Sequence, residues 1–345
     1  MPWTCKTAFT CRGRWPAGHA PAIVGGVENL RAGPADVIAV ATAYDLGVPL
    51  APPAPAARGQ QGIVWRVETG RGRFAVKELI DPLTEPEVAV DVALQSTMVT
   101  RGVHAPRPLL TPGGAVLTSV GRLLFRAYTW VDIDDERLDL PPAAVGALLA
   151  TLHRDPIPAA PPVDPWYTDP VPDEQWTAVA DRLAAARAPF AAEFAASVTH
   201  FRAMRDLFRA PGPTQLCHRD LWAGNIRLSP DGLCVIDWDN CGPAEAAQEL
   251  AMPLFDFCHA DPDRARLLYR AYLDAGGPAR LGARDDFTMV LAQFGHFAVT
   301  AGEWWLEAIG DEDGRARAEA WFREGWERPL DRAGIDALLE AVRDA

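Results

Sequence analysis

One segment of the chain places acidic and amide side chains at a spacing that could do chemistry. It reads LCHRDLWAGNIRLSPDGLCVIDWDN and contains His218, Arg219 and Asp220, then Asn225, and finally Asp237. The letters IRLS, a Pro-Asp-Gly turn and LCVIDW predict a β-hairpin between the asparagine and the last aspartate. Such a hairpin would return Asp237 to a position beside Asn225.

These side chains fit the requirements of phosphoryl transfer. That reaction needs a carboxylate to hold the acceptor hydroxyl and take its proton, and oxygen ligands to hold Mg²⁺ against the phosphates. Asp220 would be the base, whereas Asn225 and Asp237 would be the metal ligands. We expect His218 to hold the loop. The structural alternative is a loop whose Asp and Asn residues only cap turns, and the full pattern with its hairpin disfavours it.

A cation for the nucleotide phosphates is expected at Lys77. This lysine lies in FAVKELI, which follows GIVWRVET and a GRGR turn and so predicts the second strand of a hairpin. A lysine in a strand usually faces solvent, but the downstream motif favours a role at the α- and β-phosphates. Its carboxylate partner should come from the next helix, where Glu87 and Asp91 lie one turn apart. Asp91 is the first choice, because Thr84 and Glu87 form a capping box.

The elements around the lysine predict a small sheet with one main helix. The loop RGQQGIVW, which ends in Gly62, could cover the phosphates with backbone amides, although its glycines fit ordinary turns equally well. A helix is expected from about Leu30 to Leu46, and a Pro- and Ala-rich linker from Val48 to Arg58. Two strands, a helix that ends near Thr100, and the strands AVLTS and RLLFRAYTWV follow.

The second half of the chain predicts helices around the motif. A helical region is expected from about Glu174 to Phe208, a compact loop-and-strand unit from Gln215 to Pro243, and then helices rich in aromatic residues.

Composition limits the class of protein. The chain has 345 residues and a formal net charge of -13, which argues against a nucleic-acid binder with a basic surface. Scattered basic residues without an apolar stretch from Met1 to Trp15 do not predict a secretory signal, and no apolar run is long enough to span a membrane, so we expect a cytoplasmic protein without membrane contact. Its six cysteines lack zinc spacing and are expected to be reduced and mostly buried.

Four segments resemble the aminoglycoside phosphotransferase and choline kinase-like family. CHRDLWAGNI looks like its catalytic loop, VIDWDNCG like its metal-binding segment, and FAVKE like its ATP-lysine strand. RGVHAPRPL is similar to a recurring stretch between the helix and the third strand of that family. The resemblance implies an α+β, two-lobed protein-kinase-like fold with a small antiparallel-sheet N-lobe and a mostly helical C-lobe. The expected parts are a poorly ordered leader (1–20), the N-lobe (21–130) and the C-lobe (131–345).

The same resemblance implies ATP or GTP as donor, with Mg²⁺. The adenine would then contact backbone in the strand-to-helix connection from about Ala127 to Val131, which contains Tyr128 and Trp130. Two positions depart from the family pattern: Asp91 stands where the helix acid is usually Glu, and Arg219 stands where the small-molecule enzymes more often have another residue.

The acceptor pocket is expected in the helical half, near Asp220. Aromatic and acidic side chains there would suit a small molecule that is cationic or sugar-bearing, such as an aminoglycoside, a nucleoside or macrolide antibiotic, an amino alcohol or a sugar. Aromatic residues at helical spacing are more often part of the core. The main candidates are Trp222, Asp239, His296, Glu303 and Trp304. Asp239 is equally suited to a structural role.

Several alternatives stay open from the sequence. A protein kinase is disfavoured, because Trp238-Asp239 follows Asp237 in place of Phe-Gly and no A-P-E segment follows. A non-catalytic nucleotide-binding regulatory module with the same fold is the main rival, and a purely structural helical protein is a third possibility. Both a monomer and a homodimer agree with the sequence.

Overall fold

The computed structural model describes residues 32–58, 62–80, 83–159, 162–258, 261–343 and 345. The expected leader, Cys5 and Cys11, and the start of the loop before Gly62 lie outside the described residues. Four buried cysteines in the described ranges are free: Cys217, Cys234, Cys241 and Cys258. No helix in these ranges is long and apolar enough to cross a membrane.

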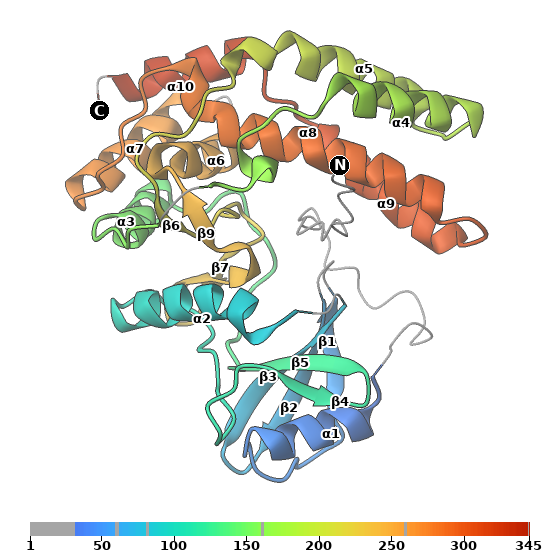
Figure 1. Cartoon of the computed structure of the whole chain (residues 1–345). Coiled ribbons are helices and arrows are strands. Elements are labelled where there is room, and N and C mark those ends of the chain that lie inside the picture. Colours follow the sequence, from blue (N-terminus) through green and yellow to red (C-terminus); the bar gives the residue numbers. More distant parts are fainter. Residues whose placement is uncertain (1–31, 59–61, 81–82, 160–161, 259–260, 344) are drawn as a thin grey trace, which may run out of the picture.

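A five-stranded antiparallel sheet forms one end of the molecule (Figure 1). Its order is β1-β2-β3-β5-β4, and its strands are β1 (Ala54–Arg58), β2 (Gly62–Thr69), β3 (Gly72–Leu79), β4 (Thr118–Val120) and β5 (Leu123–Thr129). Alternation along the strands gives the sheet an apolar face, on which Trp65, Val76 and Phe125 are buried against the helix α1 (Pro34–Ala43). Lys77, the neighbour of Val76, therefore points from the opposite face.

The prediction of a linker from Val48 to Arg58 was wrong for the residues from Ala54 onward. Ala54–Arg58 forms the edge strand β1, which pairs with β2 through an irregularity between Pro55 and Ala57. The segment lacks the β-branched residues that signal a strand, and Pro is accepted there because an edge strand leaves one row of N–H groups unused.

Helix α2 (Glu85–Thr100) lies between the sheet and the helical part of the chain (Figure 1). It begins with the predicted capping box, in which Glu87 Oε2 accepts hydrogen bonds from the backbone N–H and the hydroxyl of Thr84, both at 2.7 Å. Asp91 lies one turn further along and is buried. The helix thus presents a carboxylate to the interior between the two parts.

The rest of the chain is mainly helical, and it contains one large core that also includes residues of α2. Its α-helices are α3 (Pro142–His153), α4 (Asp173–Ala185), α5 (Ala191–Ala203), α6 (Ala246–Cys258), α7 (Pro262–Asp274), α8 (Thr288–Glu307), α9 (Glu312–Trp326) and α10 (Arg332–Arg343). The short 3-10 helices are η2 (Pro165–Tyr167), η3 (Arg205–Leu207), η4 (Trp238–Asn240) and η5 (Arg284–Phe287).

The single helical region predicted from Glu174 to Phe208 is divided into α4, α5 and η3. The break between α4 and α5 contains Arg187, with a left-handed φ of 56°, and Pro189. Proline cannot donate the backbone hydrogen bond that would continue the helix, so the chain turns there.

Two short sheets carry the central motif. Strands β6 (Gln215–Cys217) and β9 (Gly242–Ala244) pair with each other, as do β7 (Ile226–Ser229) and β8 (Gly232–Val235). The hairpin predicted between Asn225 and Asp237 is therefore present.

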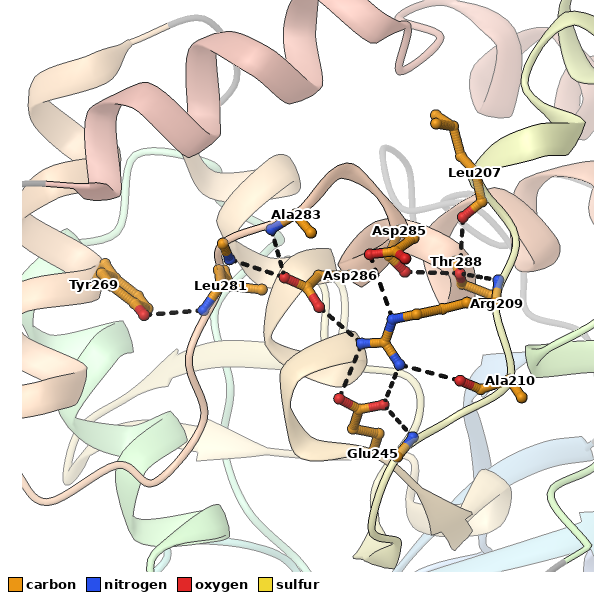
Figure 2. Close-up of polar contacts among 12 residues, drawn as sticks. Leu207, Arg209, Ala210, Glu245, Tyr269, Leu281, Ala283, Asp285, Asp286 and Thr288 are labelled. Atoms are coloured by element: carbon orange, nitrogen blue, oxygen red, sulfur yellow. Dashed lines mark hydrogen bonds and ion pairs between the residues drawn. The ribbon is translucent and has the colours of Figure 1, made fainter.

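A charged cluster fixes the chain just before this unit (Figure 2). The Arg209 guanidinium pairs with Glu245 at 2.6 Å and with Asp286 at 2.7 Å, and Asp285 lies 3.5 Å away. Glu245 stands at the start of α6, whereas both aspartates belong to η5. One side chain therefore links three segments that are distant in sequence.

Candidate active site

The Asp220 carboxylate is buried and held by three N–H donors. Trp222 Nε1 donates to Oδ1 at 2.6 Å, and the side-chain amides of Asn225 and Asn240 donate to Oδ2 at 2.8 and 3.3 Å. Asn225 also donates to the backbone carbonyl of Asp220 at 2.8 Å. The carboxylate is thus fixed in orientation before any substrate arrives, as a base that must meet one hydroxyl requires.

The two predicted metal ligands lie at the open end of the β7–β8 hairpin. The backbone N–H of Ile236, next to Asp237, donates to the carbonyl of Asn225 at 2.9 Å. Both hydrogen bonds of the Asn225 side chain use its amide nitrogen, so the amide oxygen remains available as a ligand for a cation. The Asp237 side chain is 36% exposed and adds a carboxylate. A hard amide oxygen and a carboxylate fit Mg²⁺.

Asp237 has a left-handed backbone, with φ of 57°. This conformation is uncommon outside glycine but more accessible to Asp than to most residues. It marks the point where β8 ends and the chain turns into η4. His218 Nε2 donates to the carbonyl of Ile236 at 3.1 Å, so the histidine ties the catalytic loop to this turn. Burial lowers the pKa of His218, which favours the neutral ring in this role.

Lys77 comes from the sheet and meets the acidic residues of the motif. Its Nζ lies 3.3 Å from Asp237 Oδ1 and 2.6 Å from Asp239 Oδ2. Burial lowers the pKa of Lys77, but the two carboxylates outweigh burial and raise it above its ordinary value. The ammonium is therefore charged, as a phosphate-binding group must be.

The carboxylates found at Lys77 differ from those expected. Asp239, expected in the acceptor pocket, lies with Lys77 and also accepts a hydrogen bond from Arg126 Nη1 at 2.8 Å. Asp91 lies near the same arginine, with Oδ2 3.9 Å from Nη1. Glu87 closes the capping box of α2. Asp91, at the position where the family resemblance expects Glu, therefore lies near Arg126.

Arg219 ties the catalytic loop to the segment after η4. Its guanidinium donates to the carbonyl oxygens of Asn240 at 2.7 Å and Cys241 at 3.2 Å, and it lies 4.1 Å from the centre of the Tyr167 ring. Gly242 provides the space, since a Cβ there would lie 2.6 Å from the guanidinium. The backbone of Arg219 is left-handed, with φ of 63°.

Buried polar groups hold this loop from behind. Glu249 of α6 accepts a hydrogen bond from the backbone N–H of Arg219 and another from His153 Nε2, at 2.7 Å for the latter. Gln293 of α8 donates to the carbonyl of Arg219 at 2.9 Å. Burial raises the pKa of Glu249, but His153 outweighs burial and the pKa lies below its ordinary value.

The expected nucleotide residues lie on the sheet and at its exit. Gly62 begins β2 and packs on Lys77, because a Cβ there would lie 2.9 Å from Lys77 Cε. Tyr128 is buried on β5, and burial raises its pKa. Trp130 follows β5, and its Nε1 donates to Asp132 at 2.8 Å.

The acceptor candidates lie along a series of aromatic rings that begins beside Asp220. Trp222, bonded to Asp220, stacks on Phe297 of α8 with 5.7 Å between ring centres. Phe297 contacts Trp166, which stacks on His296 at 4.8 Å. His296 donates to the carbonyl of Asp169, and burial lowers its pKa, which favours the neutral ring.

Two further candidates lie on the same helix as His296. Trp304 stacks on Trp321 of α9 at 4.8 Å, and Trp321 in turn contacts Phe297. Glu303 accepts a hydrogen bond from Gln175 of α4 at 3.2 Å. Most of these rings pack on each other, so they contribute to the hydrophobic core and are also candidates for contact with the acceptor.

Sequence reasoning missed Arg126, Asn240 and Glu249. Arg126 interrupts the apolar strand RLLFRAYTWV, and a charge in such a strand is a signal that could have been used. Asn240 and Glu249 lack a comparable signal, because turns and amphipathic helices contain such residues routinely.

Fold and site together define a two-lobed kinase-like phosphotransferase. Residues 54–284 match the phosphotransferase enzyme family, which is more than half of the chain. The chain therefore belongs to the phosphotransferase enzyme family, and the expected fold class is confirmed. No curated protein sequence matches the chain.

Solved structures share this fold at low identity. A spectinomycin phosphotransferase in complex with ADP and spectinomycin is 12% identical with a TM-score of 0.59, over 85% of this chain and 92% of that one. A microcompartment-associated aminopropanol kinase is 16% identical with a TM-score of 0.56, over 84% and 95%. An amicoumacin kinase in complex with AMP-PNP, Ca²⁺ and Ami is 14% identical with a TM-score of 0.54, over 83% and 91%.

Proposed function

We propose that this protein transfers the γ-phosphoryl group of ATP, or of GTP, to a hydroxyl of an aminoglycoside, a nucleoside or related antibiotic, or a small metabolite. The carrying observation is the position of Lys77, 3.3 Å from Asp237, at the end of the hairpin that begins at Asn225. A phosphate-binding cation and two oxygen ligands thus adjoin a carboxylate base that three donors hold in place.

Each residue has a distinct role in this proposal. Asp220 accepts a hydrogen bond from the acceptor hydroxyl and takes its proton as the oxygen attacks phosphorus. Asn225 and Asp237 would hold Mg²⁺, which neutralises charge on the phosphates. Lys77 would bind the phosphate oxygens through its ammonium group. The rings from Trp222 to Trp166 and the carboxylate of Glu303 offer stacking and a negative charge to a cationic or sugar-bearing acceptor.

The relatives support a small-molecule acceptor. The structures named above are of enzymes for spectinomycin, amicoumacin and aminopropanol, and two contain ADP or an ATP analogue. These acceptors differ widely in size, so the relatives do not select one of them for this chain.

The test is phosphoryl transfer to a panel of acceptors with ATP and with GTP. Aminoglycosides, nucleoside antibiotics, macrolides and amino alcohols would be incubated with the enzyme and Mg²⁺, and phosphorylation read by mass spectrometry. We expect transfer by the wild type and none by Asp220→Ala, with the fold of the variant checked by circular dichroism. Transfer by that variant at the wild-type rate would refute the assigned base. Binding of Mg·ATP without hydrolysis or transfer by the wild type would favour a regulatory module.

A further inference from the structure

Two cations face each other in the middle of the sheet beside the proposed nucleotide site. Lys77 on β3 and Arg126 on β5 are partners in the strand register, so their side chains leave the same face of the sheet. The Arg126 side chain is 1% exposed and that of Lys77 12%. Like charges directly opposite each other destabilise a sheet, so such a pair needs anions close by.

Asp239 supplies an anion to both cations, with one carboxylate oxygen for each. Its Oδ2 accepts from Lys77 at 2.6 Å and its Oδ1 accepts from Arg126 at 2.8 Å. Asp91 of α2 adds a second carboxylate 3.9 Å from Arg126. A chain of charges thus runs from α2 through Arg126 and Asp239 to Lys77.

Two buried N–H groups of the Arg126 guanidinium reduce stability, which indicates a functional reason for a charged residue at this position. Within the residues that the structure describes, its Nε and Nη2 groups are buried without a hydrogen-bond partner. Buried donors without partners lower stability. Apolar side chains, like those of the strand neighbours Phe125 and Ala127, would avoid that cost.

We propose that Arg126 is a positioning residue that controls the availability of Lys77 to the nucleotide phosphates. This inference rests on the proposed function. Lys77 and Arg126 share the Asp239 carboxylate, so the guanidinium neutralises part of its charge and weakens its hold on the Lys77 ammonium. Without the guanidinium, Lys77 is the cation that remains on Asp239, and it is held there more tightly. Arg126 therefore aids nucleotide binding through Lys77.

A double-mutant cycle on Mg·ADP binding tests this inference. The full-length wild type, Arg126→Met, Lys77→Met and the double variant would be compared by isothermal titration calorimetry. We expect Arg126→Met to weaken binding about tenfold, the size of one charge-assisted interaction. In the Lys77→Met background the same substitution should have no further effect, because Arg126 acts through the lysine. The matched control is Arg122→Met, in the exposed turn between β4 and β5, which should bind as the wild type does.

The outcomes separate the two proposals. The positioning role would be overturned if Arg126→Met bound Mg·ADP with wild-type affinity. It would also be overturned if Arg126→Met weakened binding equally in the Lys77→Met background. In both cases the wild type would still bind nucleotide and transfer the phosphoryl group, so the proposed function would stand. A wild type that binds neither Mg·ADP nor Mg·GDP would refute the proposed function, and the inference with it. If Arg126→Met does not fold, Arg126→Lys provides the comparison: it keeps the charge and should bind more tightly than Arg126→Gln.

Discussion

Arg219 offers a sharp test of how the catalytic loop is held. Its guanidinium bonds two backbone carbonyls and packs on Tyr167, yet its backbone has a φ of 63° that L-residues adopt at a cost. Two substitutions separate the stabilising side-chain contacts of Arg219 from the cost of its left-handed backbone. Arg219→Ala removes the side-chain contacts and keeps the backbone cost, whereas Arg219→Gly removes the same contacts and relieves it.

The magnitudes follow from the contacts. Each hydrogen bond from a charged donor contributes about 1.5 to 3 kcal/mol, and the contact with the ring adds about 1 kcal/mol. Incomplete additivity brings the expected loss for Arg219→Ala to about 4 kcal/mol. Glycine recovers about 1 kcal/mol of left-handed strain, net of its greater freedom in the unfolded chain. Arg219→Gly should therefore lose about 3 kcal/mol.

Urea unfolding at neutral pH, followed by circular dichroism, measures both values. Equal stability of Arg219→Ala and Arg219→Gly would contradict the expected backbone cost. Wild-type stability of either variant would contradict the expected side-chain contribution. Gly242→Ala extends the test, because its Cβ would lie 2.6 Å from the guanidinium. That substitution should destabilise the wild type by about 1 to 3 kcal/mol and be tolerated better in the Arg219→Gly background.

Three further outcomes are expected. Gly62→Ala would place a Cβ against the carbonyl of Glu78 and 2.9 Å from Lys77 Cε, so it should lower the melting temperature and weaken Mg·ADP binding. Glu249 has a pKa below its ordinary value of 4.5, so its contribution to stability is complete above that pH and is lost as the pH falls through the folded-state pKa. Glu249→Gln should accordingly flatten the fall in unfolding free energy between about pH 6 and pH 3. Arg209→Met should cost about 2 kcal/mol, read from urea unfolding, because it leaves partly buried carboxylates without their cation.

Each of these has a matched comparison. Gly70→Ala, in the open turn before β3, has no atom within 4 Å of the added Cβ and should leave nucleotide binding unchanged. A steeper acid dependence in Glu249→Gln than in the wild type would contradict the sign of the pKa shift. Arg266→Met removes an exposed ion pair of α7 and should cost less than about 1 kcal/mol, so an equal loss at Arg209 would mean that burial has no effect there.

The sequence was sufficient where the signal was local. Alternation predicted β2 and β3, and turn chemistry predicted the hairpin that brings Asn225 and Asp237 together. The family resemblance predicted the fold class. The roles of these residues in catalysis remain predictions, since geometry alone does not measure turnover.

The sequence was insufficient where partners are distant along the chain. Lys77 and Asp239 are separated by 162 positions, and their contact depends on how the sheet docks on η4. The strand register that sets Arg126 opposite Lys77 is likewise a tertiary property. Strand β1 was missed because packing on β2, and not intrinsic preference, makes Ala54–Arg58 extended.

The hairpin between Asn225 and Asp237 also affects the order in which the site can assemble. The strand pairs β6–β9 and β7–β8 both lie within the segment from Gln215 to Ala244, so forming them loses less chain entropy than a contact between distant segments does. The contact between Lys77 and Asp239 must instead close a loop of more than a hundred residues. During folding, Asp220, Asn225 and Asp237 can therefore take their places early, and Lys77 joins them only when the sheet docks.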